Sequence, residues 1–212
     1  MNNNIISAGV PVAKASKVLI MLHGRGADAE DILGIAAHLN VAGFALLAPQ
    51  APGNTWYPYS FIVPVQNNEP YLSQSLQTVA DTVSHAMNNG ITKENIFLLG
   101  FSQGACLASE YMARNADRYG GLVVFTGGLI GEQINRSNYT GNFNGTPVFI
   151  GTSDPDFHVP VERVYATANI LKEMGAAVTE KVYANMGHTI NQDEIANANS
   201  IVFAATVNKE SM

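Results

Sequence analysis

The sequence predicts an α/β fold: a mostly parallel central sheet with helices on both faces. Short, continuous apolar runs bounded by turn residues recur along the chain, as is typical of strands buried on both sides. Between them lie longer stretches whose apolar residues have helical spacing. This alternation indicates a parallel sheet covered by helices. The 212 residues, 47% hydrophobic and 13% charged, suffice for one large core, so we expect a single domain over 1–212.

The first half of the chain supplies three strands and three helices. The runs 18–22 (VLIML) and 44–48 (FALLA) are uninterrupted apolar stretches, which predicts buried strands. Between them, 29–39 repeats apolar residues every three or four positions, which predicts a helix, as it does in 72–87. The apolar run IFLL then predicts a strand over 96–99, and an amphipathic helix is expected directly after it, over 103–114.

The second half continues the same alternation. The runs 122–125 (LVVF) and 148–150 (VFI) predict two further buried strands with no helix between them. Helical spacing returns in 161–174, and 178–184 alternates as a half-buried strand does. The last expected helix is 194–207.

Two long segments, 49–70 and 129–146, fit neither pattern. Long loops in a compact domain are often functional. The first follows the strand 44–48 at its carboxyl end, where ligands bind in open parallel sheets. Its aromatic residues are therefore candidates for a pocket wall, with Trp56 ahead of the two neighbouring tyrosines. The alternative is that they only cover the edge of the sheet.

Charge and composition exclude several classes of partner. The formal net charge is −6, and the sequence has no basic run, so we expect neither nucleic acid nor an anionic membrane surface as a partner. No apolar stretch reaches the roughly eighteen residues that a bilayer requires, and no secretory signal is recognisable, so we expect a cytoplasmic protein without stable membrane association. The single cysteine, Cys106, excludes an internal disulfide and is expected to be a buried apolar residue.

The pentapeptide GFSQG, residues 100–104, fits the pattern G-x-S-x-G. It lies between an apolar run and an amphipathic helix, as a nucleophile elbow requires. Glycines on both sides let the chain turn sharply and hold the serine in a strained conformation above a helix N-terminus. The alternative is that Ser102 only caps this helix, so a catalytic reading needs a base, an acid and an oxyanion site elsewhere.

The other parts occur at further strand ends. His188 follows the last strand at its carboxyl end, the same edge as Ser102, and is the natural base. The loop after 148–150 supplies two candidate acids, Asp154 and Asp156, either of which could orient the histidine. HGRG, residues 23–26, follows the first buried strand, where this architecture places an oxyanion donor. There the Arg25 backbone N–H would act together with that of Gln103.

Together these motifs resemble the phospholipase/carboxylesterase family of α/β-hydrolases, which includes acyl-protein thioesterases. LHGRGAD, APQAP followed by Trp56, GFSQG, an Asp-x-x-Val-Pro segment and MGHTI occur in the family's order over nearly the whole chain. The resemblance implies an α/β-hydrolase fold without a large separate lid domain. It implies Ser102 as nucleophile, His188 as base and the N–H groups of Arg25 and Gln103 as the oxyanion hole. It also implies hydrolysis of esters or thioesters with no metal or cofactor.

The resemblance also bears on the acid. Counting back from Val159-Pro160, or forward from Pro147, leads to Asp156, whereas counting from Gly151 and the Asp-Pro dipeptide favour Asp154. We choose Asp156. In this chain Thr152-Ser153 stands where the family has His-Gly.

The expected function is that of a serine carboxylesterase that hydrolyses small to medium acyl esters through an acyl-enzyme intermediate. The alternative is an acyl thioesterase or lysophospholipase with a channel for a long acyl chain. A third hypothesis is a non-catalytic binding module on a hydrolase scaffold. It predicts that the nucleophile, the base, the acid or the oxyanion site is missing, whereas the sequence keeps all four. The expected partner is thus a small-molecule ester or thioester. The oligomeric state stays open, a homodimer included.

Overall fold

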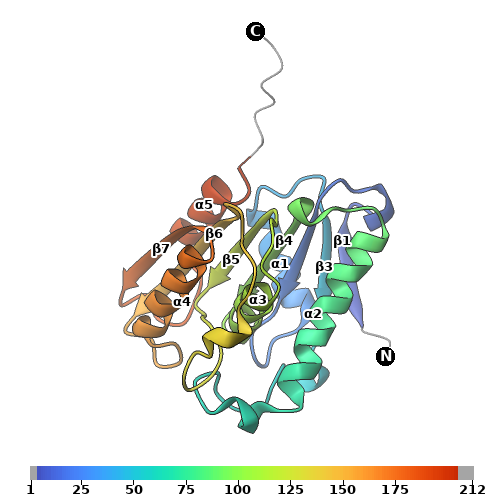
Figure 1. Ribbon diagram of the computed structural model, residues 1–212. Coiled ribbons are helices and arrows are strands. Elements are labelled where there is room, and N and C mark those ends of the chain that lie inside the picture. The colour runs from blue at the N-terminus through green and yellow to red at the C-terminus, as the bar shows by residue number, and fades with distance from the viewer. Residues whose placement is uncertain (1–3, 205–212) are drawn as a thin grey trace.

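The computed structural model describes residues 4–204, which contain one seven-stranded sheet in the order β1-β3-β2-β4-β5-β6-β7 (Figure 1). The strands β2 to β7 are parallel to one another, and β1 alone runs antiparallel, against β3. The sheet is therefore mostly parallel, as predicted. The strands are β1 Ile5–Gly9, β2 Val18–Leu22, β3 Ala45–Pro49, β4 Ile96–Phe101, β5 Gly121–Phe125, β6 Pro147–Asp154 and β7 Ala177–Ala184.

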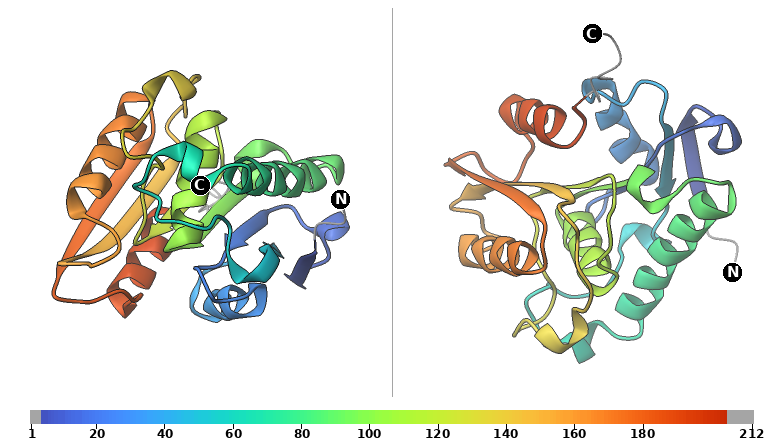
Figure 2. Two further views of the ribbon diagram at one scale, coloured as in Figure 1. Left: turned by 90° about the horizontal axis from the view of Figure 1, so that it is seen from below. Right: turned by 45° about the horizontal axis from the view of Figure 1, so that its top comes forward.

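Helices cover both faces of the sheet, with α1 and α5 on one face and α2, α3 and α4 on the other (Figure 2). Within the described residues the α-helices are α1 Ala29–Gly34, α2 Tyr71–Asn88, α3 Gln103–Arg114, α4 Val161–Glu173 and α5 Gln192–Ile201. Short 3-10 turns lie at Val12–Lys14, Ile35–His38, Pro52–Asn54, Val65–Asn68, Lys93–Asn95 and Arg136–Asn138.

The sheet divides the core into two layers. In β2, Ile20 and Leu22 belong to the layer under α2, α3 and α4, while Leu19 and Met21 belong to the layer under α1 and α5. All of them are fully buried. Because successive side chains of a strand point to opposite faces, a strand covered on both sides must be apolar throughout, which explains the run VLIML.

Most expected elements lie within a few residues of the observed ones, and β2 and α3 have the expected bounds. The expected helix 29–39 is a shorter α1 that continues as the 3-10 turn Ile35–His38. The expected helix 194–207 begins earlier and ends at Ile201; its expected residues 205–207 lie outside the described part.

The strand β1 was not predicted. Its sequence, IISAG, is neither a continuous apolar run nor a clean alternation, and it is only partly buried. It pairs along its whole length with β3, and the hydrogen bonds of this ladder rather than an apolar pattern hold it at the edge of the sheet.

Within residues 4–204, no helix combines the length and the apolarity that crossing a bilayer requires.

Candidate active site

The turn between β4 and α3 holds Ser102 in a strained backbone conformation, with φ 53° and ψ −118°. Its N–H donates to the Phe125 carbonyl at 2.9 Å, and its side chain makes no capping bond to α3. A Cβ on Gly100 would lie 2.4 Å from the Gly104 backbone, and one on Gly104 would lie 2.1 Å from the Leu22 carbonyl oxygen. Both positions therefore require glycine. The turn presents the serine rather than using it as a helix cap.

Three side chains from three strand ends form a hydrogen-bonded chain. The Nε2 atom of His188 lies 2.8 Å from the Ser102 Oγ, and its Nδ1 lies 2.8 Å from the Asp156 Oδ2. Since a carboxylate can only accept, Nδ1 carries the proton and Nε2 is left to accept from the serine hydroxyl. This is the arrangement in which a histidine can remove the serine proton.

The Asp156 side chain is fully buried, and its second oxygen accepts backbone N–H bonds from His158 (2.7 Å) and Val159 (2.9 Å). Burial by itself would raise the pKa of Asp156, but the hydrogen bonds from His188 and from these two N–H groups outweigh it and lower the pKa below its usual value. The carboxylate is thus ionised where it meets the imidazole. The other candidate, Asp154, is an exposed residue at the end of β6.

The loop after β2 is fixed by His23, which is fully buried. Its Nδ1 donates to the Gly24 carbonyl (2.8 Å), and its Nε2 accepts from the Ala51 N–H (3.1 Å). Burial lowers the pKa of His23, which favours this neutral form. Gly24 passes so close to Ser102 that a Cβ on it would lie 3.5 Å from the serine Cβ. The HGRG segment therefore runs directly beside the serine.

Arg25 and Gln103 both tie the 55–59 loop to the site. The Arg25 guanidinium donates to the carbonyl oxygens of residues 57, 58 and 59 at 2.7–2.9 Å. The Gln103 side chain accepts from the Trp56 N–H (3.0 Å) and donates to the Tyr57 carbonyl (2.8 Å). Within residues 4–204, the backbone N–H groups of Arg25 and Gln103 have no hydrogen-bond acceptor. Both N–H groups are thus left free by the described part of the chain.

Trp56, the candidate for a pocket wall, is 2% exposed and is not among the residues that line the two cavities described below. Its Nε1 donates to the His23 carbonyl (2.9 Å), and its ring packs against the His23 ring. Trp56 therefore packs against the loop that follows β2 and helps to hold it in place. The next residue, Tyr57, does line a cavity. Sequence spacing could not separate the two, because adjacent residues of an irregular loop have no fixed alternation.

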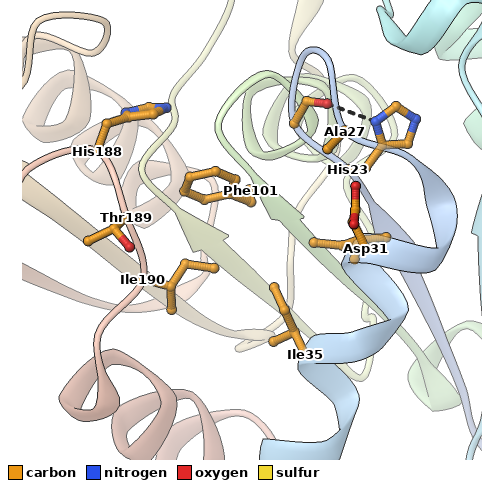
Figure 3. Close-up of a pocket in the computed structure, with 10 residues that line it drawn as sticks. His23, Ala27, Asp31, Ile35, Phe101, His188, Thr189 and Ile190 are labelled. Carbon is orange, nitrogen blue, oxygen red and sulfur yellow. Dashed lines mark hydrogen bonds between the residues drawn. The ribbon is translucent and has the colours of Figure 1, made fainter.

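Two cavities meet at His188. The first, which we call the serine cavity, has a volume of about 640 Å³; its lining includes Ser102, Gln103, Tyr57, Cys106 and Phe157. The second, which we call the α1 cavity, has a volume of about 360 Å³ and lies between α1, the end of β4 and the loop before α5 (Figure 3). Its lining includes Phe101, Ile35 and Ile190.

Two residues that sequence reasoning left without a role lie against His188. The Phe101 ring centroid is 5.2 Å from that of His188, and the His158 ring stands edge-on to it at 4.9 Å. Phe101 is the first of the two variable residues of G-x-S-x-G, so the motif itself marks its position. Nothing in the sequence indicates the contact of His158, which depends on how the loop after β6 folds.

Cys106 lies in α3, lines the serine cavity and is 1% exposed. Burial raises the pKa of its thiol to about 12. It is therefore a neutral apolar side chain, as expected from the sequence.

Comparison with known proteins places this site in a wider context. The model of the phospholipase/carboxylesterase family matches residues 3–204. A crystal structure of a phospholipase/carboxylesterase from Dyadobacter fermentans is 49% identical, with a TM-score of 0.94, and the match covers 96% of this chain and 97% of that one. These matches confirm the predicted α/β-hydrolase fold.

Curated relatives match less of the chain. A probable carboxylesterase SOBER1-like of Arabidopsis thaliana is 26% identical over 60% of this chain, and acyl-protein thioesterase 1 of Saccharomyces cerevisiae is 29% identical over 60%. The matched region spans 49% and 57% of these two relatives, about half of their length.

Proposed function

The chain belongs to the phospholipase/carboxylesterase family of serine hydrolases, and from this premise we propose that it is a carboxylesterase for small to medium acyl esters, acting through an acyl-enzyme intermediate. The observation that carries the proposal is the hydrogen-bonded chain from Ser102 through His188 to Asp156, with both links at 2.8 Å. Ser102 is the nucleophile, His188 the general base and acid, and Asp156 the residue that orients the imidazole.

In the acylation step, His188 Nε2 takes the hydroxyl proton as Ser102 Oγ forms a bond to the ester carbonyl carbon. The carbonyl oxygen becomes an oxyanion, which the free N–H groups of Arg25 and Gln103 stabilise. The bond from carbon to the leaving oxygen then breaks, and His188 returns the proton to that oxygen. Water repeats the sequence on the acyl-enzyme and releases the acid.

The serine cavity supports a compact acyl group. Two of its lining residues, Tyr57 and Cys106, are each 1% exposed and belong to the core on the face of the sheet that α3 covers. The 55–59 loop above it is held by Arg25, Gln103 and Ser75, whose Oγ donates to the Trp56 carbonyl at 2.6 Å. A wall fixed in this way resists the displacement that a long chain would require.

Acyl thioesterase activity is a second candidate function, because the chain is similar in sequence to an acyl-protein thioesterase. A series of esters and thioesters from two to sixteen carbons separates the two. The carboxylesterase proposal expects kcat/KM to pass through a maximum at short or medium chains; a steady rise to long chains, or a preference for thioesters at every length, would favour the second candidate.

The direct test is covalent labelling. A fluorophosphonate should add one label at Ser102 and abolish hydrolysis of p-nitrophenyl butyrate, while Ser102→Ala should take no label and lose several orders of magnitude in kcat. An unlabelled wild-type protein, or a Ser102→Ala variant as active as the wild type, would overturn the proposal.

A further inference from the structure

The α1 cavity has a lining suited to an apolar group. Ile32 contributes from α1. Ile35 contributes from the 3-10 turn that follows α1, Phe101 from the end of β4, and Ile190 from the loop before α5 (Figure 3). Its volume of about 360 Å³ leaves ample room for a group of the size of a benzyl ring.

The position of the α1 cavity relative to the reacting atoms indicates which half of the ester, acyl or alcohol, it can hold. After the carbon–oxygen bond breaks, the acyl group stays bonded to Ser102, and the serine lines only the serine cavity. The leaving oxygen must receive its proton from His188, which lines both cavities. The α1 cavity therefore touches the residue that the leaving group needs and not the residue that keeps the acyl group.

We propose that the α1 cavity receives the alcohol half of the ester and selects compact, apolar, uncharged alcohols. This inference rests on the proposed function, because it assigns the two sides of the same site.

The charges around the α1 cavity support the proposal that it disfavours alcohols carrying a negative charge. The lining includes one acid, the exposed Asp31, and neither lysine nor arginine. Asp31 is held in the first turn of α1, where its Oδ2 accepts from the Asp28 N–H (3.0 Å). His23, the lining residue next to it, is kept neutral by its burial. An alcohol carrying a carboxylate or phosphate would meet a negative charge with no cation to balance it.

The size selection is tested with two ratios of kcat/KM, which reports acylation, the step in which the alcohol leaves. The alcohol ratio compares benzyl acetate with ethyl acetate, and the acyl ratio compares ethyl hexanoate with ethyl acetate. Ile35→Trp should lower the alcohol ratio about tenfold and leave the acyl ratio unmoved, and Ile35→Ala should raise the alcohol ratio. Ile62 is a lining residue of the serine cavity, so Ile62→Trp should lower the acyl ratio instead.

Ala37→Trp is the matched control, since Ala37 is an exposed residue of the same 3-10 turn and lines neither cavity. It should move neither ratio, and thermal melting of each variant checks the fold. An acyl ratio lowered by Ile35→Trp would make the α1 cavity the acyl site and overturn the inference. An alcohol ratio unmoved by both Ile35 variants would also overturn it.

The charge selection is tested with Asp31→Asn, which keeps an oxygen to accept from the Asp28 N–H. The substrates are benzyl acetates that carry a 3-carboxylate or a 3-carboxamide. The variant should raise the ratio of carboxylate to carboxamide about two- to fivefold at low salt, and added salt should shrink the change. Glu30→Gln removes a neighbouring exposed charge outside the cavity and should change the ratio less; an equal change would show a general field effect and overturn the role of Asp31.

The inference and the proposed function fail in different ways. If no ester is hydrolysed in a manner that depends on Ser102, the proposed function is wrong. If hydrolysis depends on Ser102 but the alcohol ratio is the same in the wild type and in both Ile35 variants, only the inference is wrong.

Discussion

Asp156 and Asp154 lie two residues apart, yet only the first reaches His188. The strand β6 continues to Asp154, so that residue is fixed at the end of the sheet and exposed. The chain then turns, and the Asp156 side chain is buried beneath the imidazole. The two backbone N–H groups that bond its second oxygen fix the direction of the carboxylate.

A pair of substitutions tests this difference. Asp156→Asn should lower kcat by about 10³–10⁴, because an amide in this position favours the wrong tautomer of His188. Asp154→Asn should stay near the wild-type value. Steady-state kinetics on p-nitrophenyl butyrate measures both; a larger loss from Asp154→Asn would contradict the proposed role of Asp156.

Single residues of the site were predictable to different degrees. Ser102 and His188 occur in motifs tied to strand ends, and the parallel sheet brings such ends together whatever the loops do. Trp56 and Tyr57 belong to a loop whose shape depends on Arg25 and Gln103, which contact it from distant parts of the chain. No local pattern encodes such contacts.

At the scale of elements, the site depends on how closely α3 approaches β2. Gly104 is in the first turn of α3, and its Cα faces the carbonyl of Leu22 with no room for a methyl group. This contact sets the helix N-terminus, and with it the free Gln103 N–H, beside the loop that follows β2.

Gly104→Ala should therefore destabilise the protein by about 1–3 kcal/mol, or more, because the helix must shift away from the sheet. Gly34→Ala is a matched control: Gly34 has a helical φ of −57°, and a Cβ there would meet nothing within 4 Å. That variant should be stabilised by roughly 0.5–1 kcal/mol. Urea denaturation compares the two, and equal effects would contradict the packing argument.

Among the elements, those with a strong apolar pattern were predicted and β1 was not. The difference is physical: central strands are buried on both faces and need apolar side chains, whereas an edge strand is held by backbone hydrogen bonds that any sequence can make. The helix α1 was predicted too long because its apolar spacing continues through the 3-10 turn that follows it.

For the whole molecule, one buried acid links stability to pH. Glu194, in the first turn of α5, is fully buried beneath β6, and its Oε1 has no hydrogen-bond partner among the described residues. Its other oxygen accepts from the Asn191 N–H at 2.9 Å. Burial raises the pKa of Glu194 to about 7.

Because this pKa is raised in the folded state, the folded protein binds the proton more tightly than the unfolded chain does. The stability that Glu194 contributes is then full below about pH 4.5 and is lost as the pH rises through about 7. Relative to Glu194→Gln, the wild type should lose about 1–3 kcal/mol of unfolding free energy between pH 5 and pH 8.

Urea denaturation at the two pH values measures this difference, with Glu30→Gln as the control for an exposed acid of another first helical turn. A wild type and a Glu194→Gln variant with the same pH dependence would show that the carboxyl is not protonated in the fold.

Because Cys106 is buried, the rate at which its thiol reacts can report local opening of the fold. Burial raises the pKa of its thiol to about 12, so the thiol is protonated at neutral pH, and the residue is only 1% exposed. A maleimide or a disulfide reagent should therefore react slowly with this cysteine, when the walls of the serine cavity or α3 itself move apart. Since the sequence has no other cysteine, the rate of thiol modification reports these openings without any engineered label.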